Sequence, residues 1–164
     1  MKTLRFSKVR DVKSPERGTP RSAGIDFFVP NDFFPTMVRP NEDLLIPSGI
    51  RADIPEGYML IGEDKSGVST SKQAAVDAGR NPGKVSFGSP TTIGAKIIDE
   101  DFQGEIHIHI INCGNFPINV RPGMKIAQFI LVPVEYCALE EVPVDELFDS
   151  ETERGSGCFG STGK

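Results

Sequence analysis

Short runs of β-branched and other apolar residues, separated by clusters of turn residues, dominate this chain. Runs of strand length lie at residues 4–9, 44–46, 49–54, 58–61, 96–98, 105–111 and 126–134. Clusters containing Pro, Gly, Asn or Asp interrupt them, for example at residues 30–32, 39–41, 47–49, 55–57 and 121–123. Many short strands with little helix are typical of an all-β sandwich or barrel, and we predict that fold class.

One stretch has a helical pattern, at residues 69–78. Ser69 is a typical helix cap, good helix formers follow it, and Gly79 is a typical terminator. Residues 79–94 then contain too many Gly and Pro residues for a regular element. We expect a long loop or an irregular hairpin there.

Length and composition narrow the function classes. A chain of 164 residues suits one domain, and it lacks both a membrane-length apolar run and the apolar region of a secretory signal. Its three cysteines are widely spaced and form no C-x-x-C pair, which argues against a disulfide framework or a zinc knuckle. We expect an intracellular protein, cytoplasmic or nuclear if eukaryotic, without membrane contact.

Charge is unevenly distributed along the chain. Residues 135–153 carry eight acids and no Lys or Arg, which leaves 18 Lys and Arg against 15 acids elsewhere. This excess permits a polyanionic ligand but is too weak for direct nucleic-acid binding. We predict a β-barrel domain over residues 1–134, an acidic linker over 135–153 and a glycine-rich arm over 154–164.

Two segments near the middle of the chain combine Gly turns with polar side chains. Asp26 follows Gly24, where a turn-stabilising carboxylate is the simpler interpretation. Lys65, Ser66 and Gly67 precede the predicted helix, and backbone N–H groups beside Ser and Lys suit a phosphate. An ordinary helix cap explains this second segment equally well.

The run DEDFQG lies between two apolar runs at residues 97–98 and 106–110, which predicts a hairpin. Its acids, Asp99 among them, are compatible with simple solvation, but Phe102 is costly to expose unless something covers it. His107 and His109 share one strand face by period two. With no third soft ligand nearby, we interpret them as ordinary strand residues rather than a metal site.

Five runs in order make a more specific pattern than any one of them. They are AGID at 23–26, KSG at 65–67, GAKIIDEDFQGE at 94–105, GMKIAQ at 123–128 and RGSGCFGSTG at 154–163. This series resembles the five motifs of the trimeric dUTP pyrophosphatases (dUTPases) and extends from about residue 22 to the C-terminus. The last run is close to diagnostic of that family.

The resemblance implies a distorted jelly-roll β-barrel with one short helix and a flexible arm, in a homotrimer whose sites lie between subunits. It also implies hydrolysis of dUTP to dUMP and pyrophosphate with Mg²⁺ held by the triphosphate and waters. That activity keeps uracil out of DNA and supplies dUMP for dTTP synthesis. Because Mg²⁺ favours phosphate oxygens and water, a missing carboxylate cluster is no objection.

The resemblance also assigns roles to residues. Asp99 holds the attacking water, Phe102 lies against the deoxyribose, and Phe159 of an arm from another subunit stacks on uracil. Asp26 supports the site. Uracil is received by the main chain of Ala95, Lys96, Ile97 and Ile98. Donors to the triphosphate are expected from Lys65, Ser66, Gln128, Arg154, Ser161 and Thr162, and Gly67 and Gly160 are also expected to bind the substrate. Because Asp is a weak base, we expect Asp99 mainly to orient and polarise water.

The chain departs from the family pattern at a few positions, and two other functions stay open. Phe102 replaces the usual Tyr, Lys65 an Arg, and Lys96 and Cys158 a Gly. Residues 79–94 form an insertion. One alternative is a dCTP deaminase-like enzyme, and the other is an interaction protein on a dUTPase scaffold that binds a protein partner through the 79–94 loop.

Overall fold

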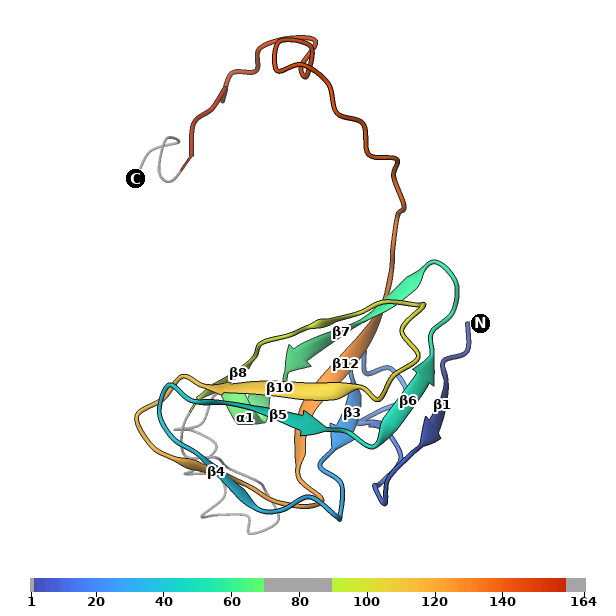
Figure 1. Cartoon of the computed structure of the whole chain (residues 1–164), viewed down its shortest axis with the longest axis vertical. Helices are drawn as coiled ribbons and strands as arrows, with labels where there is room; N and C mark the ends of the chain where they lie inside the picture. Colours follow the sequence, from blue (N-terminus) through green and yellow to red (C-terminus); the bar gives the residue numbers. More distant parts are fainter. Residues whose placement is uncertain (1, 70–89, 159–164) are drawn as a thin grey trace.

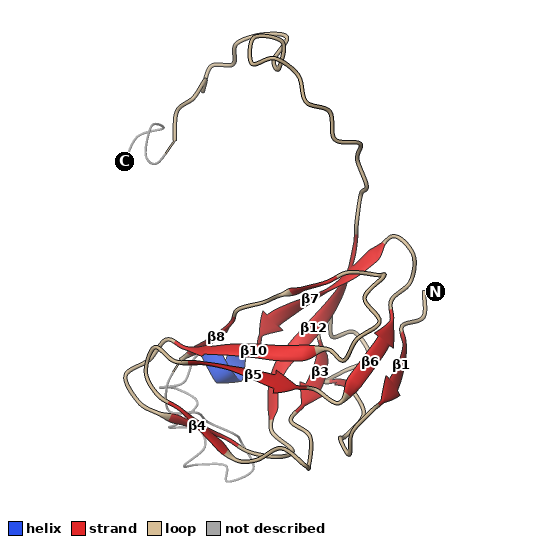
Figure 2. Ribbon diagram, in the orientation of Figure 1, coloured by secondary structure: helices blue, strands red, loops and turns tan. Residues whose placement is uncertain are grey.

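A computed structural model describes residues 2–69 and 90–158, and it is nearly all-β (Figures 1 and 2). The predicted all-β class is therefore confirmed. The elements are β1 (Arg5–Lys8), β2 (Glu16–Arg17), β3 (Ile25–Phe28), β4 (Thr36–Val38), β5 (Asp43–Pro47), β6 (Ile50–Asp53), β7 (Tyr58–Asp64), α1 (Ser66–Ser69), β8 (Thr91–Ile93), β9 (Ile97–Ile98), β10 (His107–Asn112), β11 (Ile118–Val120) and β12 (Lys125–Pro133).

The strands form two larger sheets and two strand pairs, all antiparallel. One sheet has the order β2-β3-β12-β7-β9, another has the order β5-β10-β8, and β1-β6 and β4-β11 are pairs. Apolar side chains of both larger sheets are buried together in one core. Phe27 of β3 and Phe129 of β12 are both buried in it, with ring centroids 4.5 Å apart and the ring planes tilted by 47°. This core holds the polar ends of β3, β7 and β12 in place.

The structure corrects two sequence predictions. Residues 97–98 and 106–110 do not form a hairpin, because β9 pairs with β7 whereas β10 pairs with β5 and β8. The end of the predicted 79–94 loop is strand β8, since Thr91, Thr92 and Ile93 are β-branched and find a partner in β10. Most of the predicted helix and residues 79–89 of the predicted loop lie outside the described residues, and the helix that is described begins at Ser66.

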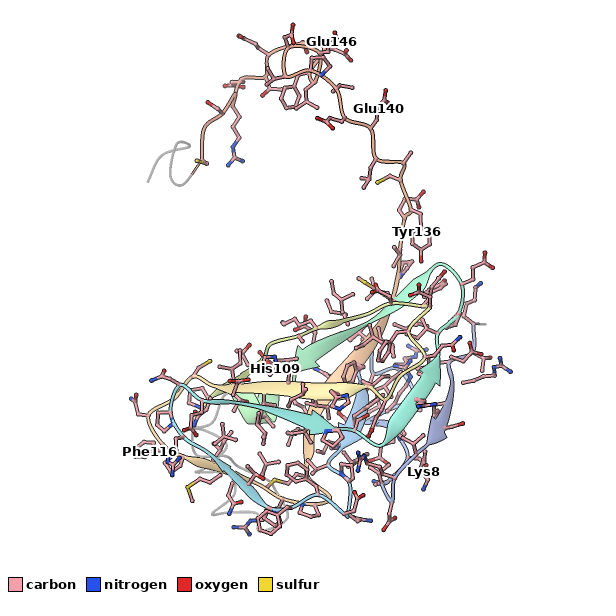
Figure 3. The ribbon with its side chains drawn as sticks, viewed as in Figure 1. Lys8, His109, Phe116, Tyr136, Glu140 and Glu146 are labelled. Atoms are coloured by element: carbon pink, nitrogen blue, oxygen red, sulfur yellow. The ribbon has the colours of Figure 1, made fainter. Side chains whose placement is uncertain are left out.

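Beyond β12 the chain leaves the sheets and runs away from them, as Figure 1 shows. Tyr136 lies at the root of this segment, and Glu140 and Glu146 lie farther along it (Figure 3). Its apolar side chains are open to solvent, Leu139 being 95% exposed, with Val144 and Phe148 almost as open. Among the described residues, no helix is long and apolar enough to cross a membrane.

Candidate active site

A buried carboxylate bound by two lysines lies where β3, β7 and β12 meet. Asp26 of β3 is only 3% exposed. Its Oδ1 accepts a hydrogen bond from Lys65 Nζ at 2.7 Å, and its Oδ2 is 2.9 Å from Lys125 Nζ. Burial acts to raise the pKa of Asp26, but hydrogen bonds from Lys65 and Lys125 outweigh it and lower that pKa below its usual value.

A bulge in β12 explains how Lys125 reaches this carboxylate. Gln128 is the direct cross-strand partner of Asp26, so the two residues share a face. Lys125 lies three positions before Gln128 and would face the other side of a regular strand. The pairing of β12 with β3 shifts between Lys125 and Ala127, and this irregularity brings Lys125 to the carboxylate.

The Gln128 side chain joins two neighbouring segments. Its Nε2 donates to the main-chain oxygen of Asp64 at 2.9 Å, at the end of β7. A Cβ atom at Gly24 would overlap the Gln128 amide, so a side chain there would displace the Gln128 side chain. The runs that contain Gly24, Lys65 and Gln128 are therefore adjacent in space, as a joint role requires.

Replacing the buried carboxylate tests this cluster. Asp26→Asn removes the carboxylate that both lysines bind, and because the lysines stay partly exposed to water we expect the free energy of unfolding at pH 7 to fall by about 1–3 kcal/mol. A lowered folded pKa stabilises the protein above the unfolded Asp pKa of about 3.9, and this stabilisation is lost as pH falls through the folded value. Urea denaturation from pH 7 to pH 2 should show the unmodified protein and the variant converging in acid. A pH-independent gap would contradict this.

Strand β9 is the last strand of the five-stranded sheet, and no strand of residues 2–69 or 90–158 pairs with its outer side. Gly62 N–H donates to the Lys96 oxygen at 2.7 Å, and the pairing continues between Ile61 and Ile97. Successive residues of an antiparallel strand direct their main-chain groups alternately toward and away from the neighbour. Ile97 therefore presents its N–H and C=O to the open edge, a donor and an acceptor suited to a planar polar ring.

The next segment is a tight turn that exposes an unengaged carboxylate. Phe102 N–H donates to the Asp99 main-chain oxygen at 3.2 Å, and the Glu100 carboxylate accepts the N–H of Gly57. The Asp99 side chain is exposed, and no hydrogen bond or ion pair to its carboxylate is found among the described residues. Burial and the Glu100 hydrogen bond raise the pKa of Tyr136 above its usual value, and the charge of Asp99 adds to this. Phe102 is 43% exposed, and a Cβ at Gly104 would collide with its ring. The turn is thus anchored by Glu100 while Asp99 is free to bind water.

One chain does not bring this turn and the lysine cluster together. Glu100 is bound at Gly57, just before β7 begins, whereas Lys65 follows the end of β7. A strand rises about 3.3 Å per residue, so the seven residues of β7 separate the two by roughly 23 Å. Asp99 and Phe102 therefore lie about a strand length from Lys65, whereas Gln128, the partner of Glu63, lies part of the way along β7.

The other predicted site residues are only partly described. Ser66 and Gly67 open helix α1, directly after Lys65. Lys96 pairs with Glu63 at 3.2 Å, and Arg154 is exposed on the C-terminal segment, where its Nε donates to Gly157 O. Phe159, Gly160, Ser161 and Thr162 lie outside the described residues.

Sequence reasoning missed one member of the cluster, Lys125. It lies within the run GMKIAQ, so its positive charge could have indicated a role beside Asp26. In a regular strand, however, Lys125 would face away from Asp26 and Gln128. Within the described chain, no group of three or more His, Cys, Asp or Glu residues is arranged to hold a metal ion. These residues define an all-β protein with a lysine–carboxylate cluster at one end of β7 and, at the other end, a strand edge followed by the exposed Asp99.

Comparisons with known proteins agree with this class. The dUTPase family model matches residues 86–163. A deoxyuridine 5'-triphosphate nucleotidohydrolase of Chlamydia pneumoniae is 38% identical over 91% of this chain and 90% of its own, and a mouse protein of the same name is 32% identical over 99% and 86%. The chain belongs to the dUTPase family.

Solved structures agree at the level of the fold. A Staphylococcus bacteriophage 80alpha dUTPase with dUPNHPP superposes with a TM-score of 0.78 at 24% identity, over the whole of both chains. A dUTPase of phage phi11 of S. aureus, described with a structural Mg(II) ion, gives 0.68 at 21% identity over 86% of this chain and 97% of its own.

Proposed function

We propose that this protein is a dUTP diphosphatase that hydrolyses dUTP to dUMP and pyrophosphate by attack of water on the α-phosphorus. Family membership across nearly the whole chain supports the reaction. The observation that carries the proposal is the exposed, unengaged Asp99 on an anchored turn directly after the free edge of β9. Phosphoanhydride hydrolysis needs an aligned water and neutralised phosphate oxygens rather than covalent participation by the protein.

Each part of the candidate site then has a task. The Ile97 edge pairs with uracil, whose ring carries both acceptors and an N–H donor. Phe102 covers the sugar and leaves no room for a 2′-hydroxyl, which selects deoxyribose. Asp99 accepts a hydrogen bond from water and turns the water's lone pair toward phosphorus. As a weak base it contributes mainly by orienting that water.

Lys65 is suited to the triphosphate even while it binds Asp26. An ammonium group has three donors, Asp26 takes one, and the Lys65 side chain is partly exposed. Gln128 and Ser66 lie on the same side of the fold as further donors. We place Mg²⁺ on triphosphate oxygens and waters, which this ion prefers to an all-protein cage. When bound there, Mg²⁺ neutralises phosphate charge.

We further propose a homotrimer with sites between subunits, on a jelly-roll β-barrel. Separation of Asp99 from Lys65 by the length of β7 supports this, because one subunit supplies only part of a site. The exposed apolar side chains of residues 139–148 support it too, since a covering surface would remove them from water. The acidic residues 135–153 repel one another, which keeps the tether extended so that residues 154–164 reach a neighbour.

Substrate selectivity tests the proposed activity. Purified protein with Mg²⁺ should release pyrophosphate from dUTP at least about 100-fold more efficiently, in kcat/KM, than from dCTP or UTP, because base pairing rejects cytosine and the covered sugar rejects a 2′-hydroxyl. dTTP differs from dUTP only by one methyl group on the base, and we expect a preference for dUTP of at least about 10-fold. Pyrophosphate-coupled absorbance measures this. Similar rates for all four would contradict the specificity, and ammonia release from dCTP would indicate a deaminase instead.

A further inference from the structure

His109 of β10 has both ring nitrogens engaged, and its partners fix its tautomer (Figure 3 shows its place). The main-chain N–H of Ala95 donates to Nδ1 at 3.0 Å. Nδ1 must therefore carry a lone pair, so in the neutral ring the proton is on Nε2. Nε2–H donates to Asp43 Oδ2 at 2.9 Å.

The fold around the ring is built to hold it there. Leu45 of β5 is the direct partner of His109, so Asp43 lies diagonally across the strand pair, within reach of a long side chain. Gly94 N–H donates to the His109 main-chain oxygen at 2.8 Å. A Cβ atom at Gly94 would overlap the imidazole, so the absence of a side chain admits the ring.

The His109 ring supports the start of residues 95–98, the segment whose outer edge is proposed to bind uracil. Ala95 is held from one side by His109, and the next residue, Lys96, is held from the other side by Gly62 N–H. These two bonds fix the direction of the backbone just before Ile97. A change at Ala95 therefore rotates the donor and acceptor that Ile97 presents.

We propose that His109, oriented by Asp43, is a positioning residue that sets the backbone of the base-binding segment and so the affinity for the pyrimidine. The inference rests on the proposed dUTPase function. His109 does not touch the reacting phosphate in this scheme. Its loss should therefore weaken binding and leave the chemical step nearly unchanged.

Three substitutions of His109 in the full-length protein separate the effect of its Nδ1 acceptor from the effect of packing its ring. His109→Phe keeps a ring without polar atoms, and His109→Gln reaches Asp43 but places no acceptor beside Ala95. His109→Asn keeps an acceptor near the position of Nδ1. An N–H that loses its acceptor destabilises the segment more when it is buried than when it is exposed, as Ala95 is. We expect His109→Phe and His109→Gln to raise the KM for dUTP about fivefold to tenfold, with kcat within about twofold. The KM of His109→Asn should stay near that of the unmodified protein.

The kinetic outcomes decide the proposal. Unchanged KM values for His109→Phe and His109→Gln would overturn it. So would a KM for His109→Asn as high as that for His109→Gln, or a fall in kcat at constant KM. If His109→Phe shows no cooperative unfolding transition on heating, Asp43→Ala and Asp43→Asn provide a second pair of variants for the same test. The amide of the Asp43→Asn variant still accepts from Nε2–H and should keep the KM, whereas Asp43→Ala should raise it, and equal values would overturn the proposal.

A readout without substrate separates this inference from the proposed function. Amide hydrogen exchange of Ala95, measured by NMR on the ligand-free protein, should be several-fold faster in the Phe and Gln variants than in the unmodified protein. Equal exchange, or a ¹⁵N spectrum with the His109 proton on Nδ1, would overturn the positioning role. An inactive unmodified protein with the expected Ala95 exchange would instead refute the dUTPase proposal alone.

Discussion

Asp99→Asn should lower kcat for dUTP about 1,000-fold while changing the affinity for the nucleotide little. The amide keeps the size of the carboxylate but accepts less strongly and carries no charge, so the attacking water loses its orientation and polarisation. Removal of a positioned acceptor for the reacting proton typically costs between about 100-fold and 10,000-fold. Pyrophosphate release gives kcat, and titration with a non-hydrolysable dUTP analogue gives the affinity.

The same turn supplies the control for that experiment. Asp101 is also exposed, whereas Glu100 is engaged with Gly57 and would report a structural change instead. Asp101→Asn therefore changes the net charge of the turn as Asp99→Asn does, and its kcat should stay within about threefold of the unmodified value. Equal losses in both variants would mean that turn charge, not water orientation by Asp99, is responsible.

Local pattern predicted the strands with clear apolar runs, assigned no strand-length run to β2, β3, β4, β8 and β11, and predicted strand partners poorly. β5, β6, β7, β10 and β12 all coincide with apolar runs visible in the sequence. The predicted hairpin at DEDFQG failed because alternation specifies which face a residue takes, not which distant strand it pairs with. β9 pairs with β7, and β10 closes instead on β8 and β5, so the turn between them joins two sheets.

The candidate site shows the same division. The runs containing Asp26, Lys65 and Gln128 were expected to act together, and the structure places them side by side. Lys125 was missed because the bulge that turns it toward Asp26 leaves no mark in the pattern of a strand. The His109 network depends on a residue 14 positions away and one on another strand, which no periodicity reveals.

Mixing two inactive variants should restore activity if each site draws its parts from two subunits. One variant is Asp99→Asn, and the other is Lys65→Gln, which removes a phosphate-binding charge a strand length away. In a closed ring of randomly mixed subunits, a site needs an intact turn from one chain and an intact cluster from the next. A one-to-one mixture should therefore regain about one quarter of the unmodified activity. Unfolding and refolding the mixture in urea exchanges the subunits.

A pair of variants that both alter the turn after β9 distinguishes recovery through shared sites from other causes of recovered activity. Asp99→Asn and Phe102→Ala both alter the turn after β9, so every mixed site contains one defect or the other, and the mixture should regain no activity. Recovery in this second mixture would indicate a trivial effect of refolding. Absence of recovery in the first, with both variants folded by circular dichroism, would mean that one chain holds a complete site. The roughly 23 Å between the two halves would then have to close by movement within the subunit.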